Sequence, residues 1–484
     1  MSSRRVIALL RVLLLCSVCG AQLAASARAS EPAVGAGSLP RAFAARGFEG
    51  AALSALVVER ASGAEVFAQN ADALLMPAST QKVLTAVAAL SLFGPSHRFV
   101  TTLRASRAIG PDGTVGDLFV SGGDPAMTSE QWWRLAADLR ALGLREVRGD
   151  LVLDDSLFDE QRWHPSWAPL SARAFHAPIS PLSANYGAFR VRIAPGAEPG
   201  LALQATIDPP VPYLHLVNQG RTGKAGSAAT LAVERTAGTA QESVLVTGNV
   251  PLGTPPDDVW RSVSDPLAYA AAVLRLQLEA NGIHVKGGVR RAAAAPGAAL
   301  LLEFEGLPLQ QIASLFLKYS NNFIAECLLR WLALGPAPAP TSAPASWAAG
   351  SEALRARLLA LGVPFGQAHT VDGSGLSREN RVSARVLVET LRRGDALFEM
   401  GPELLSGLPI AALDGTLAHR AGDARGRVRA KTGSLDGVTS LAGFARSERG
   451  REFVFAVIAN DLHHGDAAAT AALDGVAAAL ARGE

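Results

Sequence analysis

The segment PASTQKVLTA, residues 77–86, places a lysine three residues after a serine, at Ser79 and Lys82. A desolvated lysine can lose its proton inside a protein, whereas arginine cannot. A helix that begins at Ser79 puts both side chains on one face, so a neutral Lys82 can accept the Ser79 hydroxyl proton. Taken alone, the pair also fits a serine that caps a helix and a lysine that faces solvent. The chain has 45 lysine and arginine residues, but its only lysines are Lys82, Lys224, Lys286, Lys318 and Lys431.

A second candidate group is Ser320-Asn321-Asn322, within KYSNNFIAE. A hydroxyl near Lys82 could pass a proton to a leaving amine, and the Asn322 amide could hold a substrate carbonyl and steady Lys82. Ser183-Ala184-Asn185 repeats the spacing, but it lies in a part of the chain with β texture. We therefore favour the copy at 320, which begins a helical run. Either copy alone also fits a turn or a helix cap.

A third group, Lys431-Thr432-Gly433-Ser434, lies on an expected strand. Lys431 offers a compact charge for a substrate carboxylate, and Thr432 adds a hydroxyl donor. Gly433 allows the backbone to approach a substrate closely. The N–H groups of Ser434 and Ser79 could together form an oxyanion hole. Alone, the group also fits a surface turn.

The elements that must position these groups follow from the hydrophobic pattern. Residues 51–69 predict two strands around a turn, and a helix follows up to Gly94-Pro95. From about 100 to 295 the short apolar runs predict mostly β structure with one clear helix at 128–143. The C-terminal part combines two sheet-like runs with a closing helix at 466–481. The pattern predicts an α/β domain that is split in sequence by a mainly β insertion.

Composition narrows the class of protein. A chain of 484 residues with 49% hydrophobic and 18% charged residues predicts two or three folded domains. Its net charge of +2 gives no electrostatic basis for binding nucleic acid or an acidic membrane. In residues 1–29, Arg4 and Arg5 precede an apolar run that is followed by small residues. This pattern predicts a cleaved export signal, and an uncleaved anchor is the alternative. We find no later segment long and apolar enough to span a bilayer, so the mature protein is expected to be exported and soluble.

Together, S-x-x-K, S-x-N and K-T-G occur in the order found in serine β-lactamases and penicillin-binding proteins. The long separation between Ser79 and Ser320 distinguishes the chain from compact β-lactamases. The chain resembles the class C low-molecular-mass penicillin-binding proteins, the D-alanyl-D-alanine carboxypeptidase/endopeptidases. The resemblance covers nearly the whole mature chain through SGGDPAMT, GDLVLDDSLFD, KYSNNFIAE, VDGSGLSREN, LPIAALDGTLAHR and KTGSLDGVTSLAGF.

This resemblance implies a serine β-lactamase/transpeptidase-like domain and two nested, mainly β insertion domains. It implies acylation of Ser79 by D-Ala-D-Ala ends or cross-links of peptidoglycan stem peptides, hydrolysis of the acyl-enzyme, and inhibition by β-lactam antibiotics in the periplasm. No metal or organic cofactor is implied. Asp154 and Arg378 match positions that bind the side chain of the stem peptide's third residue, although Asp155 is adjacent to Asp154. The implied domains are 32–101 with 293–484 (catalytic), 102–197 with 260–292 (second) and 198–259 (third).

Three alternatives stay open from the motifs. A β-lactamase would share the acylation step but hydrolyse the acyl-enzyme faster, and we identify no glutamate for its deacylating water. A general serine esterase or amidase would use the same Ser79 and Lys82 pair. A non-catalytic wall-binding protein would keep the fold without the chemistry.

Overall fold

The structure is a computed structural model that describes residues 38–238, 241–337 and 343–483. The expected signal peptide, residues 1–29, lies outside these ranges. None of the helices within the described ranges combines the length and apolar character needed to cross a bilayer.

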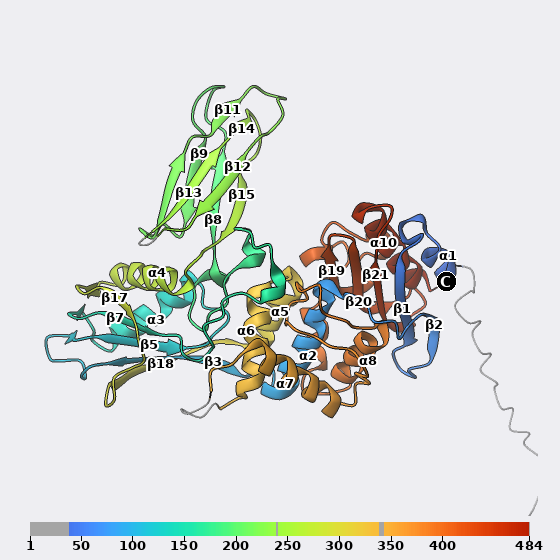
Figure 1. The fold of residues 1–484 in the computed structure, drawn as a ribbon, viewed down its shortest axis with the longest axis horizontal. Helices are drawn as coiled ribbons and strands as arrows, with labels where there is room; N and C mark the ends of the chain where they lie inside the picture. The colour runs from blue at the N-terminus through green and yellow to red at the C-terminus, as the bar shows by residue number, and fades with distance from the viewer. Residues whose placement is uncertain (1–37, 239–240, 338–342, 484) are drawn as a thin grey trace, which may run out of the picture. The chain divides into compact units, whose positions relative to one another are not determined.

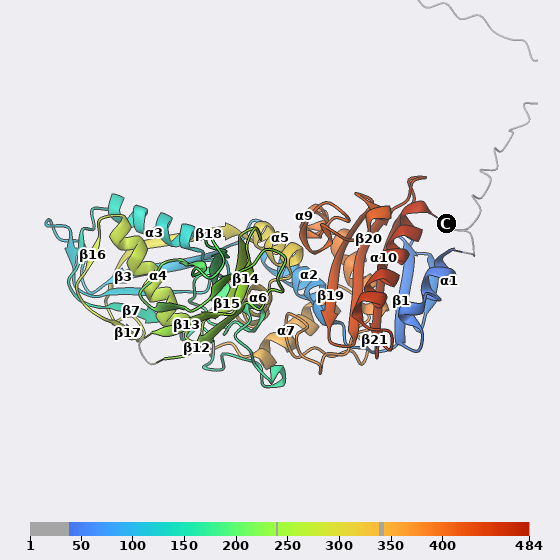
Figure 2. The same ribbon diagram turned by 90° about the horizontal axis from the view of Figure 1, so that it is seen from above.

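The candidate motifs are organised around a five-stranded antiparallel sheet (Figures 1 and 2). Its strand order joins the two ends of the chain, because strands from the C-terminal part pair with the first strand. In spatial order the strands are β19 (Val428–Leu435), β20 (Val438–Arg446), β21 (Glu452–Asn460), β1 (Ala52–Glu59) and β2 (Glu65–Gln69). The expected strands on either side of the Ser62-Gly63 turn are therefore present as β1 and β2.

Strands β1, β20 and β21 of this sheet are buried on both faces, which explains their continuous apolar runs. In β1, Ala55 and Val57 pack in a core with α10 (Asp466–Arg482), on the side where α1 (Ser38–Phe43) also lies. The alternate residues, Leu56 and Val58, pack in a second core on the other face. Because successive side chains of a strand point to opposite faces, the sheet packs between two layers of helices.

The second core is built around α2 (Gln81–Phe93), in which every residue from Gln81 to Leu90 is buried. It is surrounded by helices from the C-terminal half of the chain, which brings segments that are distant in sequence around the start of α2. These helices are α5 (Leu309–Tyr319), α6 (Asn322–Leu334), α7 (Trp347–Ala360) and α8 (Ala384–Asp395), with the short α9 (Gly401–Gly407) against α5 and α8.

A second five-stranded sheet occupies the part of the chain that we expect to be an insertion. Helix α3 (Ser129–Ala141) matches the expected helix at 128–143. Our prediction of only one clear helix there is wrong, because α4 (Pro266–Ala280) packs beside α3. The strands, in spatial order, are β17 (Val289–Arg291), β7 (Leu151–Asp154), β5 (Leu118–Gly122), β3 (Arg98–Ala105) and β18 (Ala299–Pro308), and a small sheet adds β16 (His284–Val285), β6 (Glu146–Val147) and β4 (Thr114–Val115).

Residues 188–262, which precede α4, form an all-β lobe of three small sheets (Figure 1). We refer to strands β8 to β15 as the β8–β15 lobe. The sheets are β15-β8-β9, β10-β13-β12 and β11-β14. The strands are β8 (Ala188–Ala194), β9 (Gln204–Asp208), β10 (Leu214–Asn218), β11 (Arg221–Gly223), β12 (Ala232–Thr236), β13 (Glu242–Thr247), β14 (Asn249–Pro251) and β15 (Asp257–Ser262).

Candidate active site

Ser79 lies in a single 3-10 turn, Ala78–Thr80, that leads directly into α2. Ala78 has a φ of 49°, in the left-handed region that favours glycine. The turn is held from inside, because the Thr80 hydroxyl donates to the Pro77 carbonyl over 2.6 Å. Ser79 itself remains half-buried. The sequence thus forms a sharp entry to the helix that leaves the serine hydroxyl accessible.

Lys82 is fully buried, and its Nζ atom has three oxygen neighbours. It lies 3.0 Å from Ser79 Oγ, 2.7 Å from Asn322 Oδ1 and 2.8 Å from the Ser374 carbonyl oxygen. The last two oxygens can only accept hydrogen bonds. A neutral amine would give its two hydrogens to them, and its lone pair would then face the Ser79 hydroxyl. This geometry suits a base that takes the Ser79 proton.

Burial lowers the pKa of Lys82 to about 7, from an ordinary value near 10.5. The charges of Glu326 and Asp372 oppose this shift and favour the ammonium form. At neutral pH a substantial fraction of Lys82 is therefore unprotonated. The neutral amine that the hydrogen-bond geometry favours is accessible without a large change of pH.

The buried acids beside Lys82 were missed by the sequence reasoning. Glu326 accepts hydrogen bonds from Trp347 Nε1 and from the backbone of Gly373 and Ser374. Burial, together with the charge of Asp372, raises the pKa of Glu326 to about 7. Both acids lie in strings that carry the family resemblance, Glu326 at the end of KYSNNFIAE and Asp372 in VDGSGLSREN. Those strings were the available signal for these residues.

The loop that contains Asp372 holds the Ser374 carbonyl against Lys82. The Asp372 carboxylate accepts from the backbone N–H groups of Gly375 and Ser377 and from the side chains of Asn380 and Trp167. At Gly375, an added Cβ would lie 1.8 Å from the Ala78 carbonyl oxygen. The loop therefore packs directly under the Ser79 turn because it has a glycine there.

The other two motifs contact each other. Ser320 ends α5 with a φ of 57°, and Lys431 Nζ donates to its hydroxyl over 2.9 Å and to the Thr432 carbonyl over 2.7 Å. Burial, followed by the positive charge of Lys82, lowers the pKa of Lys431 well below its ordinary value. Thr432 Oγ1 donates to the Thr416 hydroxyl. The structure thus joins Ser320 to Lys431, and Asn322 to Lys82.

Strand β19 is the edge strand that borders Ser79. An added Cβ on Gly433 would lie 2.9 Å from both Ser79 N and Pro77 O, and 2.2 Å from Ser440 Oγ. The Ala430 N–H points away from the sheet, to the Pro409 carbonyl. Because N–H directions alternate along a strand, the N–H of Ser434 points to the same open side. The exposed Ser434 therefore offers a backbone donor at the edge near the Ser79 turn.

The second copy of the S-x-N spacing is placed differently. Asn185 accepts from Ser129 N and donates to Tyr269 Oη, so its amide holds the insertion together. Lys318, two residues before Ser320, is partly buried. It is 17% exposed and pairs with Asp414 over 2.7 Å, which closes the loop after α9.

The two residues expected to bind the third stem-peptide residue lie apart from these contacts. Asp154 ends β7 and is half-buried, and its carboxylate accepts from Ser156 N. The neighbouring Asp155 is buried between Arg162 and Arg291. Arg378 is exposed and donates to the Asp436 carbonyl, in the turn that follows β19.

Within the described residues, no group of three or more histidine, cysteine, aspartate or glutamate side chains is arranged to hold a metal ion.

Comparison with known proteins identifies relatives over nearly the whole described chain. Residues 38–482 match the family model described as the D-Ala-D-Ala carboxypeptidase 3 (S13) family. A D-alanyl-D-alanine carboxypeptidase of Actinomadura sp. is 35% identical over 452 residues, which cover 90% of this chain and 82% of that protein. The D-alanyl-D-alanine carboxypeptidase DacB of Haemophilus influenzae is 30% identical, with 82% of this chain and 83% of the relative covered.

The fold is similar to that of a solved relative. The crystal structure of penicillin binding protein 4 from Haemophilus influenzae superposes with a TM-score of 0.75 at 28% identity, and covers 91% of this chain and 97% of that chain. A second structure of that protein, in complex with a β-lactam, gives a TM-score of 0.71 at 28% identity, with coverage of 91% and 98%. The predicted fold class, α/β with a serine β-lactamase/transpeptidase-like domain, is confirmed.

Proposed function

Because the chain belongs to the D-Ala-D-Ala carboxypeptidase 3 (S13) family, we propose that it cleaves D-Ala-D-Ala ends and cross-links of peptidoglycan stem peptides through an acyl-enzyme on Ser79. The observation that carries this proposal is the set of contacts around Lys82 Nζ. Two oxygens that can only accept and one hydroxyl surround a buried amine whose pKa is lowered to about 7. That arrangement supports a serine nucleophile with a lysine base.

In acylation, neutral Lys82 takes the Ser79 proton as Oγ attacks the carbonyl carbon of the penultimate D-Ala. The N–H groups of Ser79 and Ser434 stabilise the developing oxyanion. When the C–N bond breaks, the Ser320 hydroxyl gives its proton to the leaving amine and is reprotonated by the Lys431 ammonium. The lowered pKa of Lys431 supports this donation.

In deacylation, a water oxygen attacks the ester carbonyl. The water proton returns through Ser320 to Lys431, and Lys82 returns its proton to Ser79 as the C–O bond breaks. The enzyme regains its starting protonation state. The leaving amine is free D-Ala in carboxypeptidation and a second stem peptide in endopeptidation.

Substrate placement uses the remaining motif groups. Lys431 and Thr432 supply donors for the substrate carboxylate, and Gly433 lets an extended peptide lie along the edge of β19. The Asn322 amide holds Lys82 and lies where a substrate carbonyl can approach. For the third residue of the stem peptide we propose Asp154 and Arg378, which present opposite charges to a diaminopimelate side chain.

We also propose three domains, with boundaries moved to keep each sheet intact. The expected boundary at 101/102 cuts β3, and the one at 292/293 separates β18 from the sheet it completes. Boundaries near 97 and 308 avoid both cuts. Because β8 pairs with both β9 and β15, the third domain would extend from about 188 to 262.

We place the enzyme in the periplasm, because its proposed substrate is peptidoglycan and its sequence begins with an expected export signal. N-terminal sequencing of the mature protein from a periplasmic extract tests this placement. A start near residue 30 is expected, and an intact Met1 in the membrane fraction would contradict a cleaved signal.

A labelled-penicillin gel with wild type and Ser79→Ala tests the acyl-enzyme, and mass spectrometry of products from cross-linked muropeptides tests the substrate. Stable label on wild type alone, together with D-Ala release, is expected. Rapid turnover of the antibiotic would favour a β-lactamase, cleavage of simple esters without muropeptide products would favour a general esterase, and no label would favour a non-catalytic wall protein.

A further inference from the structure

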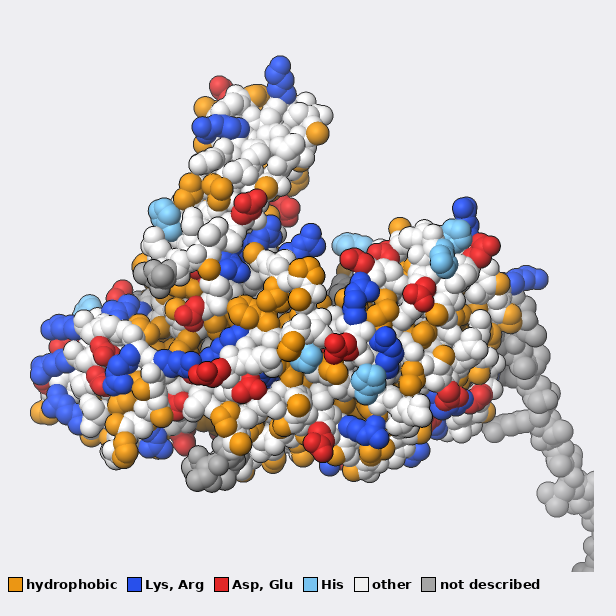
Figure 3. Space-filling model, viewed as in Figure 1, with side chains coloured by type: hydrophobic (Ala, Val, Ile, Leu, Met, Phe, Trp, Pro, Cys, Tyr) orange, Lys and Arg blue, Asp and Glu red, His pale blue; other side chains and the backbone are white. Residues whose placement is uncertain are grey.

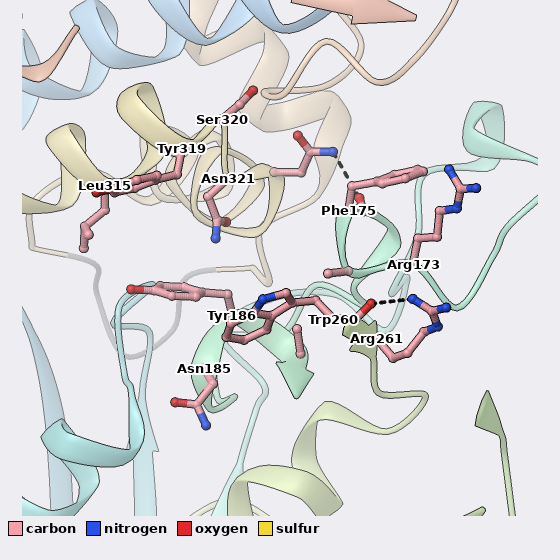
Figure 4. A pocket seen from close by; sticks show the side chains of 13 residues that line it. Arg173, Phe175, Asn185, Tyr186, Trp260, Arg261, Leu315, Tyr319, Ser320 and Asn321 are labelled. Carbon is pink, nitrogen blue, oxygen red and sulfur yellow. Dashed lines mark hydrogen bonds between the residues drawn. The ribbon is translucent and has the colours of Figure 1, made fainter. Parts of the chain in front are cut away.

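A cavity of about 820 Å³ lies beside the Ser320 motif (Figure 4). One wall comes from the end of α5 and the residues that follow it, including Tyr319, Ser320 and Asn322. The opposite wall comes from the insertion and from the base of the β8–β15 lobe. Its volume falls within the range typical of small-molecule and peptide sites. The cavity is therefore lined both by α5 with the residues that follow it and by the insertion.

The cavity adjoins the proposed chemistry through a direct hydrogen bond. Asn322, whose Oδ1 accepts from Lys82, donates through Nδ2 to the Phe175 carbonyl over 3.0 Å. Phe175 also lines the cavity. Ser320, the proposed proton donor to the leaving amine, lines it as well. A leaving group that extends beyond its amine would therefore meet this cavity.

Aromatic rings that would normally be covered are exposed here. Tyr319 is 69% exposed, Trp260 is 49% exposed and Phe175 is 42% exposed. Tyr186 and Trp260 lie side by side in the cavity, with Tyr319 approaching from α5 (Figure 4). Hydrophobic side chains also gather at the base of the β8–β15 lobe on the face shown in Figure 3. An exposed aromatic cluster of this kind indicates a binding surface.

Two guanidinium groups in the same cavity have no carboxylate partner among the residues that the structure describes. The backbones of Arg173 and Arg261 pair through an isolated bridge, which places the two residues next to each other. Arg261 donates only to the carbonyls of Val233 and Trp260, and within the described residues neither arginine forms an ion pair. Burial and the charge of Arg173 lower the pKa of Arg261. In contrast, Arg190 at the base of the same lobe pairs with two acids.

The backbone of the wall is strained as well. Asn185 and Tyr186 are consecutive non-glycine residues with φ values of 49° and 62°. Such conformations are unfavourable for non-glycine residues and cluster at functional sites. They aim the Tyr186 ring into the cavity, whereas the Asn185 side chain is used for contacts within the insertion.

We propose that this cavity binds the second stem peptide of a cross-link, the strand that leaves in endopeptidation, with a carboxylate of that strand on Arg173 and Arg261. This inference rests on the proposed function. Stem peptides carry several carboxylates, which match two unpaired guanidinium groups. An uncharged sugar would stack on the rings but would not need the arginines. A single D-Ala leaving group is too short to extend from Ser320 across the cavity, so the site selects for cross-links.

The test compares two substrates on the double variant Arg173→Gln/Arg261→Gln. The first substrate is a disaccharide-tetrapeptide dimer joined by a cross-link, and the second is a disaccharide-pentapeptide monomer that releases only D-Ala. We expect kcat/KM for the dimer to fall at least about tenfold, as loss of charged hydrogen bonds implies. D-Ala release and labelling by penicillin should stay within about twofold of wild type. Arg192→Gln, which removes an exposed charge from β8 of the same lobe, is the matched control and should change neither.

A second variant, Trp260→Ala, removes aromatic surface without changing charge, and it should produce the same selective loss. Equal losses on both substrates, or none on the dimer, would overturn the proposal. A dimer treated with amidase to remove its sugars identifies the occupant. If the double variant cleaves this sugar-free dimer as well as wild type does, the glycan is the occupant and the proposal is wrong.

The outcomes also separate this inference from the proposed function. Wild type that neither binds penicillin covalently nor releases D-Ala would refute the proposed function. Wild type that does both, with a double variant unchanged on cross-links, would refute only the cavity proposal.

Discussion

The surroundings of Lys82 and the cavity beside Ser320 are adjacent, but they differ in how completely the chain satisfies its own polar groups. Around Lys82 the amine, the Asn322 amide oxygen and the Ser374 carbonyl are paired within the protein. In the cavity, Arg173 and Arg261 have no acidic partner in the described part of the chain, and Tyr319 is exposed. A site for bond breaking benefits from a preformed geometry, whereas a site for recognition is completed by its ligand.

The largest expected effect comes from a substitution in the preformed surroundings of Lys82. Lys82→Met keeps a chain of similar length but removes the proton acceptor, so acylation by penicillin should fall by about 10³-fold. Stopped-flow or gel-based acylation rates measure this loss. Retained thermal unfolding within a few degrees of wild type serves as the control, and near-normal acylation would exclude Lys82 as the base.

A second prediction concerns the close approach of β19 to the Ser79 turn. In Gly433→Ala the new methyl group would lie 2.2 Å from Ser440 Oγ and 2.9 Å from Ser79 N. The strand must shift, so acylation should fall by about 10²-fold and the free energy of unfolding by about 1–3 kcal/mol. Penicillin acylation and denaturant unfolding measure the two effects.

Gly475→Ala is the matched control for that variant. Gly475 is exposed on α10, and an added Cβ would meet no atom within 4 Å. Acylation should be unchanged and stability should rise by about 0.5–1 kcal/mol. Similar acylation losses in both variants would show that close packing at Gly433 is unimportant.

A third prediction concerns recognition of the third residue of the stem peptide by Asp154. Asp154→Ala should lower kcat/KM about tenfold for diaminopimelate-containing peptides, since it removes a charged partner. Simple D-Ala-D-Ala esters should be cleaved at nearly the wild-type rate. Equal losses on the two substrates, measured in parallel, would count against the third-residue pocket.

The smallest expected effect tests how the charge of Glu326 changes the pKa of Lys82. The Glu326 charge raises the pKa of Lys82, so Glu326→Gln should move the pH at which acylation reaches half its maximum below the wild-type value near 7. At pH 7, where part of Glu326 is ionised in the wild type, the rate relative to its maximum should rise above the wild-type half-maximum. The new amide would face N–H donors, so stability should fall by about 1–3 kcal/mol. A midpoint that rises would contradict this sign.

Local patterns predicted much of the fold. The helix after Ser79, the strands around Ser62-Gly63 and the closing helix are all present. Helix α4 was missed although its start had two signals, Pro266 and Asp265, whose carboxylate caps the N–H groups of Leu267 and Ala268. The alanine-rich middle of α4 lacks a strong helical hydrophobic pattern. The short apolar runs on either side therefore led to a prediction of β structure.

The site was predictable at the level of motifs but not of contacts. Spacing alone places Lys82 beside Ser79, because both lie on one turn. The Ser374 carbonyl that orients Lys82 comes from 292 residues away, and no local pattern specifies that pairing. The contact between Lys318 and Asp414 was equally unpredictable from local sequence. Tertiary folding, rather than the sequence around Lys318, brings the two side chains together.

The pKa of Lys82 tests the central claim most directly. The chain has only five lysines, so carbon-13 labelling of their ε positions gives an NMR spectrum that can be resolved, and the signal missing from Lys82→Met assigns that residue. We predict a Lys82 signal that titrates near pH 7 in wild type. A Lys82 signal that stays protonated up to about pH 10, the ordinary range for lysine, would contradict the account.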